Sequence, residues 1–103
     1  MTVERSLLSQ AVDIHLAFGP EARVPAAERL KAAHPELSSA RAEALTAEAS
    51  SICSEGFSLA ERAWHGEMSP DEGRTKLGQM FPMLDEAALD HLWMKGGYFA
   101  WHG

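Results

Sequence analysis

The chain has 103 residues, a formal net charge of −6 and one cysteine, Cys53. This length fits one domain with a single core, and one cysteine allows no intramolecular disulfide, so we expect a single domain over residues 1–103 in the reducing cytoplasm. No stretch approaches the ~18 apolar residues of a membrane helix, no secretory signal is visible, and the acidic balance disfavours nucleic acid and anionic membranes as partners.

The first element is predicted to be a helix from about Val3 to Phe18, with Thr2 as its N-cap and Gly19-Pro20 as its stop. Leucines, alanines and branched residues recur at helical spacing along it. Its solvent side is predicted to consist of Ser6, Ser9, Gln10 and Asp13.

A short second helix, Pro25–Ala33, precedes a long third helix that begins at Ser38 or Ser39 and ends at His65. Bulky and small apolar residues alternate along one stripe of the long helix, so a partner helix can approach closely at the small positions. The stripe consists of Leu45, Ala49, Ile52, Gly56, Leu59 and Ala63. A second apolar row lies beside it, and this breadth predicts packing against more than one neighbour. The second row consists of Cys53, Phe57, Ala60 and Trp64.

The fourth helix is predicted at Pro70–Met80, because Ser69 is a suitable N-cap, Pro70 suits the first turn and Glu72 can complete a capping box. The fifth helix begins after Asp85 and carries Gly96-Gly97 in its interior. The pair costs roughly 1–2 kcal/mol of helix propensity. Either Gly96 lets the helix cross a neighbour closely, which we favour, or the helix breaks there.

The tetrapeptide Ala-Trp-His-Gly occurs at 63–66 and again at 100–103, at the ends of the two long helices. Each copy stands at the end of a segment that is predicted to consist of a short helix, a proline and a longer helix. This pattern reflects either an internal duplication or the sequence features that helical hairpins commonly share. With no alternating strand pattern anywhere, we predict an all-α fold, a compact bundle of about five helices arranged as an N-terminal helix plus two short-long hairpins.

No catalytic, metal or cofactor site is predicted. The five histidines offer no pair at i,i+3 or i,i+4, and Cys53 lies on an apolar row, which is typical of a buried residue rather than an activated thiolate. The serines of the long helix lack a nucleophile elbow, and Gly96-Gly97 lacks the spacing of a phosphate-binding loop.

Aromatic and methionine residues are concentrated in the last third of the chain, and such residues are favoured both in cores and at interfaces. One interpretation places Phe81, Leu84, Trp93 and Phe99 in the core with the others around it. The other makes the cluster a surface for a protein partner. The candidate partner-binding residues are Met80, Phe81, Met83, Trp93, Tyr98 and Trp101.

Residues 77–92, with Met80-Phe81-Pro82 followed by Leu89-x-x-Leu92, resemble the first two helices of CUE-type ubiquitin-binding domains. In that family a Met-Phe-Pro turn contacts ubiquitin. The chain departs from the pattern because it lacks the third helix and the dileucine that complete the family's surface. The resemblance implies that Met80, Phe81 and Met83 can form an edge for protein docking.

Three functions remain open from the sequence. The first is a non-catalytic protein-binding module, such as an adaptor, inhibitor or immunity-type protein, whose acidic surface could meet a basic partner. The second is a bundle that binds a small ligand or cofactor in a pocket lined by Trp64, Trp93 and Trp101 with nearby histidines. The third is an accessory subunit of a larger enzyme, or a homodimer through the small-residue stripe.

Overall fold

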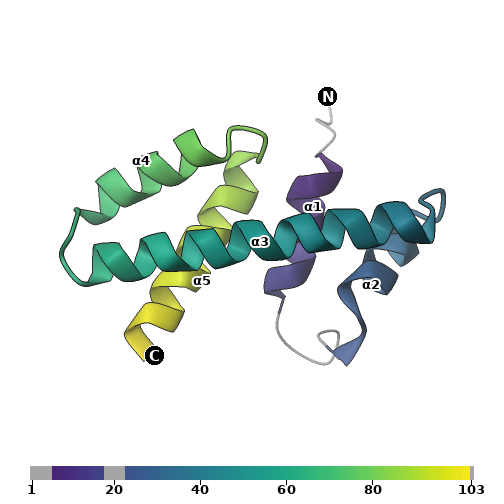
Figure 1. Cartoon of the computed structure of the whole chain (residues 1–103), viewed down its shortest axis with the longest axis horizontal. Helices are drawn as coiled ribbons and strands as arrows, with labels where there is room; N and C mark the ends of the chain where they lie inside the picture. The colour runs from purple at the N-terminus through teal and green to yellow at the C-terminus, as the bar shows by residue number, and fades with distance from the viewer. Residues whose placement is uncertain (1–5, 18–22, 103) are drawn as a thin grey trace.

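The computed structural model describes residues 6–17 and 23–102, and over these residues it is all-helical, which confirms the predicted fold class. Five helices occur in the described ranges, in the predicted short-long order after the first. They are α1 (Leu7–Leu16), α2 (Ala26–Ala33), α3 (Ser39–Trp64), α4 (Pro70–Met80) and α5 (Glu86–His102) (Figure 1).

Helix α3 runs the length of the molecule, and the other four helices pack against it (Figure 1). Helices α1 and α2 contact its N-terminal half, whereas α4 returns beside its C-terminal half and α5 crosses it. The predicted stripe of α3 is buried from Leu45 to Leu59 and becomes half-buried at Ala63. The core is continuous and is built mainly of Leu and Ala side chains from the five helices.

Side-chain caps set the helix starts, as the sequence indicates. Ser38, Ser69 and Asp85 each accept a hydrogen bond from a backbone N–H three residues later, at 3.1, 3.1 and 2.8 Å. These bonds occupy N–H groups that have no partner within the helix. At the end of α3, Gly66 adopts φ +84°, a conformation that glycine reaches without steric cost.

The first helix differs from its prediction. Its described part is capped by Ser6, whose Oγ accepts the Ser9 N–H at 3.0 Å. The Thr2 cap, the start at Val3 and the stop at Phe18 to Pro20 lie outside the described residues.

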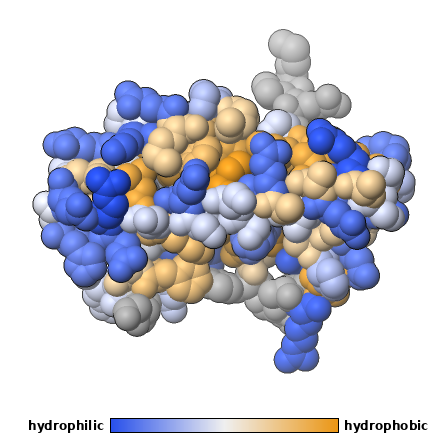
Figure 2. Space-filling model, in the orientation of Figure 1, coloured by the Kyte–Doolittle hydropathy of each residue, from blue (hydrophilic) through white to orange (hydrophobic). Residues whose placement is uncertain are grey.

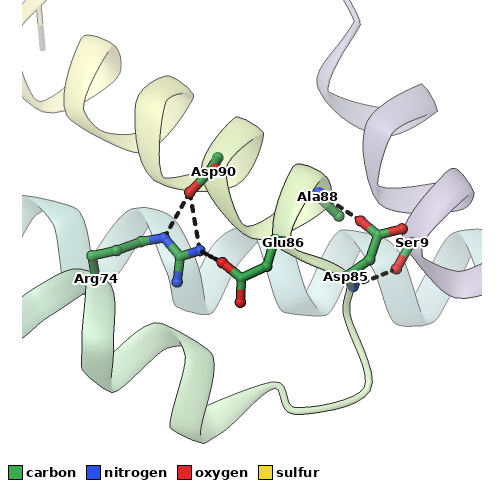
Figure 3. Close-up of polar contacts among 6 residues, drawn as sticks. All are labelled: Ser9, Arg74, Asp85, Glu86, Ala88 and Asp90. Atoms are coloured by element: carbon green, nitrogen blue, oxygen red, sulfur yellow. Dashed lines mark hydrogen bonds and ion pairs between the residues drawn. The ribbon is translucent and has the colours of Figure 1, made fainter.

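Ser9 was predicted on the solvent side of the first helix, and that prediction is wrong, because Ser9 is fully buried. Its Oγ accepts the backbone N–H of Asp85 at 2.9 Å, so the hydroxyl ties α1 to the start of α5 (Figure 3). A polar residue that binds a distant backbone group is satisfied in the interior, and periodicity on its own cannot reveal that partner.

Arg74 of α4 links the two helices of the second hairpin, α4 and α5. Its guanidinium donates to Asp90 at 3.0 Å and to Glu86 at 2.8 Å on α5 (Figure 3). The two carboxylates are exposed and the arginine is about one-quarter exposed, so the triad orients α4 on α5 without burying unpaired charge. These acids have a structural role.

Candidate functional site

The crossing of α3 and α5 is made close by glycine. A Cβ at Gly96 would lie 2.8 Å from the Ala60 Cβ, and a Cβ at Gly56 would lie 2.8 Å from Leu92. Such distances are shorter than packed carbon atoms tolerate, so these two positions require glycine for the helices to meet as they do. Helix α5 continues unbroken through Gly96 and Gly97, and the prediction of a close crossing is confirmed.

Beside this crossing, α3, α5 and the start of α4 surround an apolar hollow of about 300 Å³, here called the tryptophan hollow. It is lined by Ala60, Ala63, Trp64, Pro70, Trp93 and Gly97. Trp64 is 55% exposed, whereas Trp93 is partly buried and packs against the core.

The Trp93 ring is held in place from the side of α4. A Cβ at Gly73 would lie 2.5 Å from the tip of that ring, so only glycine at this position lets the indole approach α4 this closely. Gly97, one turn further along α5 than Trp93, has no atom within 4 Å of where its Cβ would be. The hollow is therefore rigid on its Trp93 side and empty on its Gly97 side.

A second and smaller hollow of about 170 Å³ lies between the same two helices and is here called the phenylalanine hollow. Its walls are Phe57, Glu61, Gly96, Phe99 and Ala100. The two phenylalanine ring centroids are 5.2 Å apart, tilted by 57°. This separation is within the favourable range for aromatic pairs.

Large apolar side chains continue over the outer face of α5 next to the hollows. Met94, Tyr98 and Phe99 are exposed, and Trp101 is 63% exposed. Figure 2 shows apolar surface above and below α3, separated by a mainly hydrophilic strip along that helix. The lower patch lies where the C-terminal half of α5 is seen in Figure 1.

The predicted partner-binding residues do not form one surface. Phe81 is 7% exposed and belongs to the core, so its side chain is not available to a partner. Met80 lies in a groove with Glu55, Ser58 and Arg62 of α3, whereas Phe99 meets Phe57 on another face of that helix. Tyr98 and Trp101 are exposed on the C-terminal half of α5, and Trp93 forms a wall of the tryptophan hollow.

Of the residues that line the tryptophan hollow, Trp93 alone belongs to the predicted partner-binding set, and the set lacks Trp64 and Gly97 among others. Trp64 was assigned to a packing row, although the repeated Ala-Trp-His-Gly already signals that it occupies a helix end like Trp101. The sequence predicts a role in close crossing for Gly96 and none for Gly97. Only Gly96 has that role, because the Gly97 position faces empty space.

The described residues hold no group of three or more His, Cys, Asp or Glu side chains that could bind a metal ion. Cys53 is buried as predicted, and desolvation, with a smaller effect from the Asp13 carboxylate, raises the pKa of its thiol to about 12. A thiol with that pKa is protonated near neutral pH and is a poor nucleophile.

Two histidines act as links between helices. His91 Nδ1 lies 2.9 Å from the Asp13 carboxylate, which joins α5 to α1, and His34 Nε2 lies 2.6 Å from Gln10, which joins the end of α2 to α1. Neither histidine lines either hollow, and both contacts are partly buried. They stabilise the packing of α1.

Comparison of the chain with protein-family models, curated proteins and solved structures finds no match. In the described part of the chain, no helix combines the length and apolarity that crossing a bilayer requires.

Proposed function

We propose that this protein is a non-catalytic protein-binding module, and that its tryptophan hollow receives a large apolar side chain from the partner. Trp64 and Trp93 form two walls, and Trp101 lies one helical turn beyond Gly97 on the same face of α5. Aromatic residues around a pocket that accepts an anchor side chain are typical of the energetic centre of protein interfaces.

This proposal depends most on the open space beside Gly97. A glycine inside a helix costs roughly 0.5–1 kcal/mol relative to alanine. At Gly96 that cost is explained by the contact with Ala60, but at Gly97 there is no neighbour that a methyl group would meet. The glycine weakens the helix without serving its packing, and its evident effect is to leave the tryptophan hollow open.

A partner side chain fits the tryptophan hollow better than a small ligand does. Ligand pockets usually enclose most of the ligand and contain several polar groups that orient it. The lining of this hollow has only indole N–H groups as side-chain donors, and neither hydroxyl nor charge. The ligand-binding alternative shares the walls Trp64 and Trp93 but lacks the polar groups that specificity would need.

The acidic net charge of −6 supports a protein partner rather than a nucleic acid, because the chain offers few cations to neutralise phosphates. We place the module in the cytoplasm, where a single buried thiol such as Cys53 remains reduced. Adaptor, inhibitor and accessory-subunit roles all use such a surface in the same way.

The test selects binders from a displayed library of random peptides on the immobilised protein and measures their affinity for two alanine variants. Gly97→Ala places a methyl group in the hollow, and we expect it to weaken binding by about tenfold or more, which corresponds to about 1.4 kcal/mol. Gly78→Ala is the matched control: it is also a helical glycine, and its Cβ would make only ordinary contacts, at 3.5 and 3.9 Å. It should leave affinity unchanged.

Both variants are expected to gain helix stability, so a loss of binding in Gly97→Ala alone cannot come from unfolding. Peptides that bind both variants as well as they bind the parent protein contradict the proposal, as does a selection that enriches none. Light scattering completes the test. A dimer that Gly97→Ala converts to a monomer would assign the hollow to a second copy instead.

A further inference from the structure

The phenylalanine hollow uses other positions of α3 and α5 than the tryptophan hollow. On α5, Trp93 and Gly97 line the tryptophan hollow, whereas Gly96 and Ala100 line the phenylalanine hollow. Each pair is spaced by four residues and so shares one helix face. The phenylalanine hollow also has what the tryptophan hollow lacks, a carboxylate in its lining, which is that of Glu61.

We propose that the phenylalanine hollow binds the side chain of an arginine or lysine of the docked partner, so that the partner of this module is a basic segment. This inference rests on the proposed function, because the cation is taken to belong to the protein that occupies the tryptophan hollow. It adds the charge of the partner, which the apolar hollow cannot specify.

The residues of the hollow suit a cation with an apolar stem. The faces of Phe57 and Phe99 carry the negative side of the ring quadrupole, which attracts ammonium and guanidinium groups. Ala100 has only a methyl group, and the hollow of about 170 Å³ beside it leaves room for the methylene groups of Arg or Lys. Glu61 then lies where the charged end of that side chain would reach.

The present partner of Glu61 is easily displaced. His65 Nε2 lies 3.8 Å from the Glu61 carboxylate, and both side chains are about two-thirds exposed. An exposed pair at that distance contributes little, since solvent screens it. A guanidinium that lies in the hollow against the exposed part of Phe99 can make shorter, charge-assisted hydrogen bonds to the same carboxylate.

The protein's net charge acts in the same direction. At −6 it attracts basic segments over longer distances and raises their rate of encounter. One cation of the chain opposes this, since Lys95 lies four residues before Phe99 and so on the same side of α5. Removing Lys95 should therefore strengthen the binding of a cation in the phenylalanine hollow.

The experiment titrates the full protein with N-acetyl-arginine methylamide and follows the ring signals of Phe57 and Phe99 by NMR. The matched probe is N-acetyl-citrulline methylamide, which has nearly the same shape but no charge. We expect saturable shifts with the arginine derivative and none with the citrulline derivative. Glu61→Gln should weaken binding about tenfold, while Lys95→Gln should strengthen it by a smaller factor.

Glu48→Gln is the control variant, because it removes the same charge from an exposed position elsewhere on α3 and should change nothing. Equal shifts with both probes, no saturation with the arginine derivative, or equal effects of the two Glu→Gln changes would overturn the inference. Tighter binding of choline than of the arginine derivative would also overturn it, in favour of a free quaternary ammonium ligand.

This titration requires no partner protein, so its outcome is independent of the peptide selection. Peptides that depend on Gly97 but carry no Arg or Lys would leave the protein-binding function standing and remove the basic partner. A failed selection with a successful titration would leave a cation site without a docking function. The first result overturns only the inference, and the second overturns the proposed function on which it rests.

Discussion

The two halves of α3 have the same apolar periodicity and different surroundings. Towards its N-terminus, Ala42, Leu45 and Ala49 are buried beneath α1 and α2. Towards its C-terminus the periodicity continues, but Ala63 is half-buried and Trp64 is 55% exposed, because α5 crosses α3 and does not cover its end.

This difference shows that an apolar pattern indicates which face of a helix is kept from water. It does not indicate whether that face is covered by the same chain or by a partner. In the first half the cover belongs to the chain. In the second half the row is still buried as far as Ala60, and only its last turn, with Ala63 and Trp64, opens onto the tryptophan hollow. The closed half should therefore carry the stability of the fold, and the open half its interactions.

The largest effect should separate the two halves directly. We expect Leu45→Ala to lower the free energy of unfolding by about 2–5 kcal/mol, because it leaves a cavity in a buried site. Trp64→Ala removes a larger side chain, yet it should cost less than about 1 kcal/mol because much of that side chain is already in solvent. Urea unfolding of both variants makes the measurement.

Equal losses of unfolding free energy for Leu45→Ala and Trp64→Ala would contradict the difference between the two halves of α3. They would mean that the end of α3 is covered in solution, and the tryptophan hollow would then be part of the core.

The crossing between the two halves gives the next largest effect. Gly96→Ala places a methyl group 2.8 Å from the Ala60 Cβ, which is fixed to the backbone of α3, so the helices must separate. We expect a net loss of about 1–3 kcal/mol from overpacking, in spite of the gain in helix propensity. Thermal unfolding followed by circular dichroism measures it, and a variant as stable as the parent would show that the crossing is looser than described.

Most of the fold could be predicted from the sequence, since its signals are local. Ser69 with Pro70 marks the start of α4, Gly66 marks the end of α3, and the spacing from Leu45 to Leu59 marks the buried face. Each depends on residues within a turn or two of one another, where the period of the helix fixes the geometry.

The candidate site could be predicted only in part, since it depends on contacts between distant segments. Gly96 and Gly97 are adjacent and chemically identical, and only the position of Ala60 distinguishes their roles. Phe81 is of a residue type that is common at interfaces, but it packs in the core. Ser9 is of a type that is common at the surface, but it is buried and accepts a hydrogen bond from the backbone of Asp85. Composition could not decide these cases because burial is set by tertiary structure.

Ser9 tests how much the buried hydrogen bond between α1 and the start of α5 contributes to stability. Ser9→Ala removes the acceptor of the Asp85 N–H and leaves that donor without its partner at the start of α5. We expect a loss of about 1 kcal/mol, at the lower end of the cost of an unsatisfied buried group, because water can reach the half-buried Asp85. Hydrogen exchange of the Asp85 amide should accelerate more than that of the α4 amides; uniform acceleration would indicate global loosening instead.

The smallest effect has the opposite sign, and for that reason it sharpens the comparison most. Gly97→Ala should raise the free energy of unfolding by about 0.5–1 kcal/mol, because alanine favours the helix and its methyl group meets no atom within 4 Å. Its neighbour Gly96→Ala should do the reverse, so urea unfolding of this one adjacent pair contrasts a closed contact with an open one. If Gly97→Ala destabilises the protein, the glycine serves packing after all and its link to docking is lost. If it stabilises the protein while weakening peptide binding, the sequence retains a less stable helix at the one position where an empty hollow is useful.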